Sequence, residues 1–180
     1  MASTHRHPDR RSPLVFDIQE LSRRAGTMRE AQRTVPAPAD LGLEVISVPE
    51  GSDVDLDIRM ESVVEGVLVT GTATVQVQGE CARCLTEIEE DTSFNLQELF
   101  FHPGREVEDD ERLIEDESVD LEGPLRDAVV LELPFTPLCR EDCLGLCPDC
   151  GANLNDDPDH VHEADIDPRW SKLSGLDVGE

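Results

Sequence analysis

Every cysteine of this 180-residue chain lies in a close pair, and two histidines beyond the last cysteine form a fourth pair. The pairs are Cys81 with Cys84, Cys139 with Cys143, Cys147 with Cys150, and His160 with His162. Two or three residues between cysteines let one tight turn aim both sulfur atoms at a single ion, and a structural zinc site takes four such ligands. Eight donors in four pairs therefore predict two zinc ions in closed, four-ligand sites.

Disulfide bonds and redox chemistry are the competing interpretations of these cysteines. The first twenty residues lack the apolar core of a signal peptide, and no stretch approaches the ~18 apolar residues of a membrane span. A redox-active CxxC usually opens a helix, whereas the CARC at 81–84 lies between two stretches of alternating polarity. We therefore expect a hairpin tip that binds metal in a reduced, cytoplasmic protein.

The ligand pairs can be joined in two ways. The preferred partition joins the first two pairs in one site, between a hairpin tip and the end of a helix, and joins the last two pairs in a local second site. The rival is a zinc ribbon in which the Cys81 pair faces the Cys147 pair. Gly145 and Gly151 suit knuckle turns with positive φ in both schemes. Arg83 and Arg140, beside the ligands, could balance the charge of a four-thiolate zinc complex.

The formal net charge of −26 is distributed unevenly. Residues 1–34 carry seven arginines against four acidic residues, whereas residues 35–180 carry eight basic residues against 37 acidic ones, a net charge of −29. Each neutralised phosphate needs its own Lys or Arg, so the acidic body is a poor phosphate binder and better suits a basic protein partner. The arginines of the N-terminal segment include Arg10, Arg11, Arg23, Arg24, Arg29 and Arg33.

Hydrophobic patterning predicts an α+β fold, an antiparallel β meander with one or two short helices. Residues 1–35 are expected to form a basic, largely flexible arm with one short strand near 14–18. Residues 36–138 form the β domain, with an acidic loop at 105–120 and a helix that starts at Asp120 or Glu122 and ends at Pro134. Residues 139–180 form the zinc-binding region, with a short terminal helix capped by Asp167.

Four motifs together resemble the YceD family, the large ribosomal RNA subunit accumulation protein family. They are the strand ending in CxRCL, the segment LPxxPLC, the run CLGLCPDCGANLN and the tail DIDPRW, and the resemblance spans about residues 15–173. Many relatives end the cluster with Cys-x-Cys where this chain has His160-Val161-His162, a conservative change for zinc. The resemblance implies a role in 23S rRNA accumulation, rRNA processing and 50S ribosome biogenesis, with a large-subunit ribosomal protein or rRNA precursor as partner. It also makes the N-terminal arginines candidate RNA contacts, namely Arg10, Arg11, Arg23, Arg24, Arg29 and Arg33.

No enzymatic function is expected, because closed metal sites leave no open coordination position. One enzymatic alternative is a metallohydrolase in which His160 and His162 hold zinc with Asp159 or Glu163. A further alternative is a cytosolic regulatory protein that releases zinc on oxidation. His102 stands alone and is expected to be exposed. Neither a small-molecule substrate nor membrane association is expected.

Overall fold

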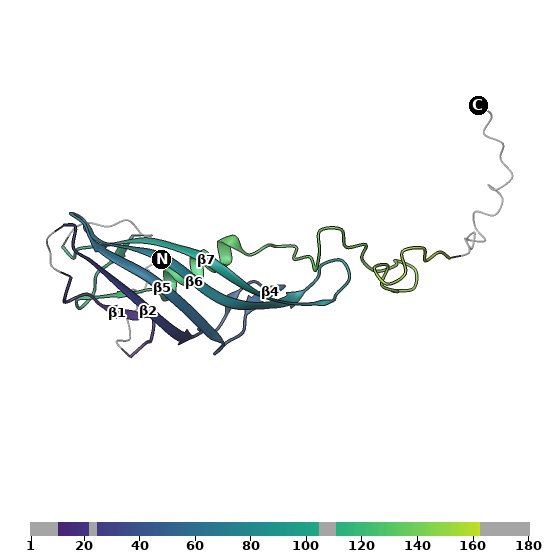
Figure 1. The fold of residues 1–180 in the computed structure, drawn as a ribbon, viewed down its shortest axis with the longest axis horizontal. Coiled ribbons are helices and arrows are strands. Elements are labelled where there is room, and N and C mark those ends of the chain that lie inside the picture. The colour runs from purple at the N-terminus through teal and green to yellow at the C-terminus, as the bar shows by residue number, and fades with distance from the viewer. Residues whose placement is uncertain (1–10, 22–24, 105–110, 163–180) are drawn as a thin grey trace, which may run out of the picture.

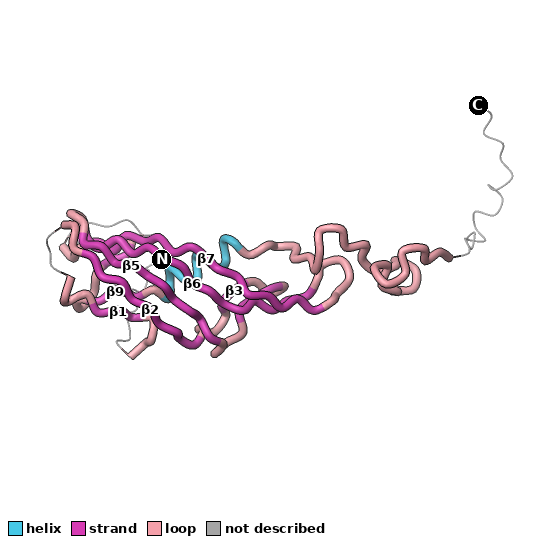
Figure 2. Tube along the Cα trace, viewed as in Figure 1, coloured by secondary structure: helices cyan, strands magenta, loops and turns pink. Residues whose placement is uncertain are grey.

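The protein is an elongated molecule with a β domain at one end and a narrow, loop-rich C-terminal segment extending from it (Figure 1). The computed structural model describes residues 11–21, 25–104 and 111–162. The expected terminal helix at Asp167 lies outside these residues. Among the described residues there is one helix, α1 (Glu122–Glu132), and the rest of the regular structure is strand (Figure 2).

An antiparallel sheet forms the body of the domain, and its four longest strands lie in the order β2-β5-β6-β7. Their bounds are Met28–Pro36, Asp53–Ser62, Gly66–Glu80 and Glu87–Phe101. The short strands β3 (Leu41–Gly42) and β4 (Ile46–Val48) extend the sheet along the second half of β6, and β8 (Arg112–Leu113) runs parallel to β7. A separate two-stranded sheet pairs β1 (Val15–Asp17) with β9 (Ser118–Asp120). The predicted meander of alternating strands is confirmed.

One face of the main sheet supplies the core. On β5, Val54, Leu56, Ile58 and Met60 are buried while the intervening aspartates face water. This period of two follows from the pleat, which turns successive side chains to opposite faces. The other face of the sheet, on which Thr34, Asp55, Thr74 and Ser93 lie side by side, is polar.

Helix α1 and the small β1–β9 sheet cover the apolar face. Leu125 and Val129 of α1 are fully buried in the same core cluster as Phe16 and Val119. The backbone N–H of Glu122 donates to Asp120 Oδ1 over 3.0 Å at the start of the helix. The helix ends at Glu132, before Pro134, as predicted. Its C-terminus therefore delivers the chain towards Cys139.

Two segments differ from the sequence expectation. The acidic run at 105–120 contains β8 and β9, with Ile114 and Val119 buried, so it is not a solvated loop from residue 112 onwards. The short strand expected near 14–18 is present as β1, but the rest of the expected flexible arm contains all but the last residue of β2, which pairs with β5 along nine residues. Strands β2 and β9 form by pairing with strands that are distant in sequence, which local patterning cannot detect.

Candidate metal centres

The hairpin of β6 and β7 positions the first ligand pair. Its strands pair without interruption from Gly66 opposite Phe101 to Glu80 opposite Glu87. The turn between them carries Cys81 and Cys84 and is closed by the Cys81 N–H, which donates to the Thr86 carbonyl over 2.9 Å. The expected hairpin tip is therefore confirmed. The Ala82 N–H also donates to the carbonyl of Pro137 over 2.8 Å, which brings the next ligand pair alongside.

Four sulfur atoms gather at this tip. The first cluster contains Cys81, Cys84, Cys139 and Cys143, whose ligand atoms all lie within 4.8 Å of one another. Cys81 Sγ is 3.8 Å from Cys143 Sγ, and Cys84 Sγ is 3.5 Å from Cys139 Sγ. A tetrahedron with Zn–S bonds of about 2.3 Å has edges of roughly 3.8 Å. A disulfide would need about 2.05 Å, and all six cysteines are free. The sulfur spacing therefore fits one tetrahedral ion.

The second cluster contains Cys147, Cys150, His160 and His162, again with all four ligand atoms within 4.8 Å. Cys147 Sγ lies 3.3 Å from His162 Nε2, and Cys150 Sγ lies 3.2 Å from His160 Nε2. Bonds of about 2.3 Å to sulfur and 2.0–2.1 Å to nitrogen give S···N edges of roughly 3.5 Å, close to these values. The structure thus groups the four pairs as the preferred partition did, and the zinc-ribbon partition is absent.

Two glycine turns shape the segment that joins the clusters. Gly145 and Gly151 have φ values of +80° and +75°, as the sequence predicted for knuckle turns. The Cys147 N–H donates to the Ala152 carbonyl, and the Gly151 N–H donates back to the Cys147 carbonyl. A Cβ at Gly145 would lie 3.1 Å from the Arg83 carbonyl oxygen, so glycine also allows close approach to the hairpin turn.

Backbone hydrogen bonds lower the pKa of one thiol in each cluster, which favours the thiolate form that binds metal. Burial raises the pKa of Cys81, but hydrogen bonds from the backbone of Cys139, Cys84 and Arg83 outweigh it and lower the value to about 6. Hydrogen bonds from the backbone of Cys150 and Asp149 likewise lower the pKa of Cys147 to about 6.

Cys139 shows the opposite shift. Its hydrogen bond with Cys84, together with burial, raises the pKa of Cys139 to about 12. Neighbouring thiolates repel one another, so a full set of four is favourable only around a cation.

Polar groups around the first cluster differ partly from those expected. Arg83 Nη1 donates to the Cys143 carbonyl over 2.9 Å, and Arg140 Nη2 donates to Asn155 Oδ1 over 2.6 Å. Within the described structure the hydrogen bonds of both guanidinium groups therefore go to oxygen rather than to sulfur. Sequence reasoning missed Thr86, whose Oγ1 lies 3.1 Å from Cys84 Sγ, and Asn155, whose amide reaches Cys143.

The arginines proposed as RNA contacts are not gathered in one free arm. Arg29 Nη1 donates to the Asp17 carbonyl, and Arg33 Nη1 donates to the carbonyls of Pro13 and Val15. Both side chains therefore bind the backbone beside or within β1. Arg11 is exposed, and the remaining candidates, Arg10, Arg23 and Arg24, lie outside the described residues.

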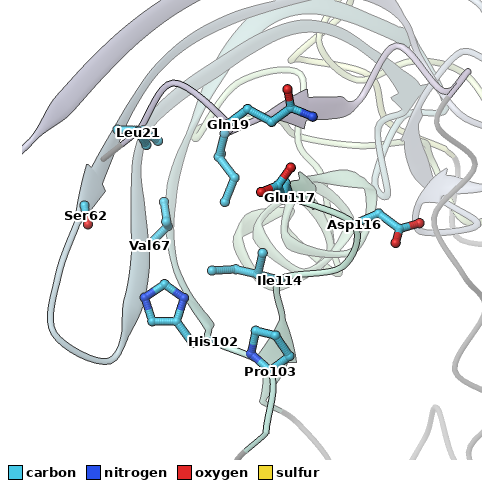
Figure 3. A pocket seen from close by; sticks show the side chains of 10 residues that line it. Gln19, Leu21, Ser62, Val67, His102, Pro103, Ile114, Asp116 and Glu117 are labelled. Atoms are coloured by element: carbon cyan, nitrogen blue, oxygen red, sulfur yellow. The ribbon is translucent and has the colours of Figure 1, made fainter. Parts of the chain in front are cut away.

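A cavity of about 380 Å³ lies at the other end of β6 from the first cluster. Apolar side chains such as Val67 and Ile114 line it, with His102 and Glu117 among its polar groups (Figure 3). His102 is half-buried there rather than exposed as expected. Its backbone N–H donates to the Glu65 carbonyl over 3.0 Å. The cavity and the two clusters are therefore separate features of the fold.

These features define a small, mostly antiparallel β protein with one short helix and a C-terminal segment of paired cysteine and histidine donors. The chain belongs to the YceD family, since the family model described as large ribosomal RNA subunit accumulation protein YceD matches residues 69–177. No helix in the described residues is long and apolar enough to cross a membrane.

The chain is similar to several bacterial proteins and one plant protein. It is 51% identical over 167 residues to the uncharacterized protein Rv2926c of Mycobacterium tuberculosis, covering 90% of this chain and 80% of the relative. It is 26% identical over 149 residues to YlbN of Bacillus subtilis, covering 74% and 85%. A 40-residue match, 42% identical, links it to the chloroplastic large ribosomal RNA subunit accumulation protein YCED homolog 1 of Zea mays, covering 22% and 14%. No solved structure matches.

Proposed function

We propose that this protein is a non-enzymatic, zinc-binding cytoplasmic factor in large-subunit ribosomal RNA accumulation and 50S ribosome biogenesis. The observation that carries this proposal is the pair of four-donor clusters in a chain of the YceD family. The name of the maize relative, which concerns the same RNA, agrees with it.

The two clusters would each hold one zinc ion. Thiolate and imidazole donors favour zinc over the hard cations magnesium and calcium, and both spacings suit tetrahedral coordination. Zinc with four protein ligands supplies cross-linking of the chain rather than Lewis-acid catalysis. Cys147 and Cys150 complete the donor set around His160 and His162, which argues against an open hydrolytic site.

A basic protein is the preferred partner. The outward face of the sheet carries exposed carboxylates, including Asp53, Asp55 and Asp57 on β5 and Glu89 and Asp91 on β7. This face repels an RNA backbone but attracts a lysine- or arginine-rich ribosomal protein over long range. We infer that the protein acts on the rRNA precursor through such a ribosomal protein.

The test is an affinity pull-down of the full chain from native cell lysate, with and without ribonuclease. Large-subunit proteins that stay bound after ribonuclease treatment, and that elute with increasing salt, would support the proposal. A second protein lacking residues 1–10 keeps β1 and β2 and shows whether the outermost basic residues contribute.

Two results would count against the proposal. If rRNA is retained in high salt by the β domain, the acidic face is not the contact and the RNA is bound directly. If neither ribosomal proteins nor rRNA are retained, the assignment to ribosome biogenesis fails.

A metal- or redox-responsive regulator is the second candidate. Each cluster contains one exposed cysteine, Cys139 in the first and Cys150 in the second, which an oxidant can reach. Rapid, complete and thiol-reversible zinc release in dilute peroxide would favour this function, whereas slow and incomplete release would exclude it.

A further inference from the structure

Asn155 connects the two clusters. It lies between Cys150 and His160, both members of the second cluster, yet its Nδ2 donates to Cys143 Sγ of the first cluster over 3.3 Å. Its Oδ1 accepts hydrogen bonds from the Leu144 N–H over 2.8 Å and from Arg140 Nη2 over 2.6 Å. One side chain in the loop of the second cluster thus binds three groups in the segment of the first.

The neighbouring contacts hold the same loop against the hairpin. Leu146 packs on the buried group of Cys81, Cys84 and Cys143, and its N–H donates to the Arg83 carbonyl over 3.2 Å. The Leu154 N–H, beside Asn155, donates to the Gly145 carbonyl over 2.9 Å. The position of the Asn155 amide therefore depends on how the loop from 147 to 162 is closed.

We infer that Asn155 couples the two metal centres, so that metal in the second cluster slows metal loss from the first. The inference rests on the proposed zinc binding and adds a regulatory link to it. A second cluster holding its ion joins the loop ends on both sides of Asn155 and keeps the amide on Cys143 Sγ.

The physical reason is the charge of the first cluster. Four thiolates around one divalent cation leave a net charge of −2, and an N–H donor to sulfur stabilises that charge. With the second cluster open, the Leu154 N–H still holds the chain before Asn155 against the Gly145 carbonyl, but the chain after it is no longer anchored through His160 and His162. Placing the amide on the sulfur then costs more conformational entropy. Binding coupling is reciprocal, so an occupied first cluster also raises the zinc affinity of the second.

The experiment measures zinc release from the full-length, zinc-loaded chain into excess chromogenic chelator. Four proteins are compared: the unmodified chain, Asn155→Ala, Cys147→Ser, and the double variant. Asp156→Asn is the matched control, because Asp156 is an exposed neighbour in the same loop. Co²⁺-loaded samples identify which cluster empties, because sulfur-to-cobalt absorption is stronger for four thiolates than for two.

We expect release from the first cluster to accelerate about tenfold in both Asn155→Ala and Cys147→Ser, which corresponds to about 1.4 kcal/mol. The double variant should be no faster than either single variant, because both remove the same link. Asp156→Asn should release zinc at the unmodified rate.

Unchanged release in Asn155→Ala, or additive effects in the double variant, would overturn the coupling while leaving zinc binding intact. A folded protein that holds no zinc would instead overturn the proposed zinc binding, and the coupling with it. Both outcomes are read from the same samples, because bound zinc is measured before the chelator is added.

Discussion

Arg33 lies over the ring of Phe16, with its Cζ 4.1 Å from the ring centroid. The ring is buried, and the guanidinium also donates to the carbonyls of Pro13 and Val15. Arg33 thus attaches strand β2 to strand β1, although the sequence suggested a contact with RNA. Arg33 therefore joins the main sheet to the separate two-stranded sheet of β1 and β9.

Arg33→Ala is expected to lower the free energy of unfolding by roughly 1–3 kcal/mol, through loss of the cation–π contact and of charge-assisted hydrogen bonds. Arg33→Lys should recover only part of this free energy, because an ammonium group lacks the planar guanidinium that can stack on the ring and donate hydrogen bonds at the same time. Urea unfolding measures both. Arg59→Ala is the control, since Arg59 pairs with Glu61 on the open face and should cost under about 1 kcal/mol. A stable Arg33→Ala protein that loses rRNA would restore the RNA-contact hypothesis.

Cys147→Ser should reduce bound zinc from two ions per chain to one. The first cluster contains none of the second cluster's residues, so it keeps a full set of four sulfurs. Metal analysis of the purified variant, after equilibration with excess zinc, checks the count. The Cys81→Ser/Cys147→Ser double variant separates the two arrangements: the grouping found here leaves it no intact four-ligand site, whereas a zinc ribbon, in which Cys81 and Cys147 share one ion, would leave it one bound ion.

Zinc affinity should fall as the pH is lowered, and most steeply below about pH 6. The pKa values of Cys81 and Cys147 are lowered to about 6, so above that pH both groups are already thiolates. Below it each must give up a proton before it can bind metal, and protons compete with zinc. Chelator competition between about pH 5 and pH 10 measures this dependence. Steepening near the ordinary thiol value of 9.0 would contradict the lowered pKa values.

Gly145→Ala should weaken zinc binding at the first cluster. The substitution meets a positive φ of +80°, and its Cβ would lie 3.1 Å from the Arg83 carbonyl oxygen in the hairpin turn. We expect a loss of stability of about 1 kcal/mol together with faster zinc release. Gly51→Ala is the matched control, because Gly51 has φ +78° with no atom within 4 Å of the added Cβ. Equal rates of zinc release from the two variants would show that the close approach of Gly145 to Arg83 does not affect zinc binding.

Local patterning predicted the elements whose signal lies in their own residues. The alternation of Val54, Leu56, Ile58 and Met60 identifies β5 without knowledge of its neighbours. Strand β9 could not be found in this way, because Ser118–Asp120 sits in an acidic run and forms a strand only by pairing with Val15–Asp17. The contact of Arg33 with β1 was hidden for the same reason, since it too joins two strands that are separated in sequence.

The metal-ligating residues of the candidate site were easier to predict from the sequence than the residues that hydrogen-bond to them. Cysteine and histidine spacing restricts which donors can share an ion, so the grouping into two clusters was predictable. Asn155 carried no such signal, because an asparagine near a turn more often hydrogen-bonds its own backbone. Asn153 does so, since its Oδ1 accepts from the backbone N–H of Asn155, and only the folded loop shows that the Asn155 side chain reaches Cys143.

Cys81 and Cys143 lie 62 residues apart in the chain and meet only after the β6–β7 hairpin and the segment beyond α1 have come together. A chain still being synthesised, or stopped before Cys139, offers the hairpin pair alone, and two sulfurs hold zinc far less firmly than four. Tight metal retention at the hairpin tip would then mark a finished molecule. The metal content of a preparation would report what fraction of its chains had completed folding.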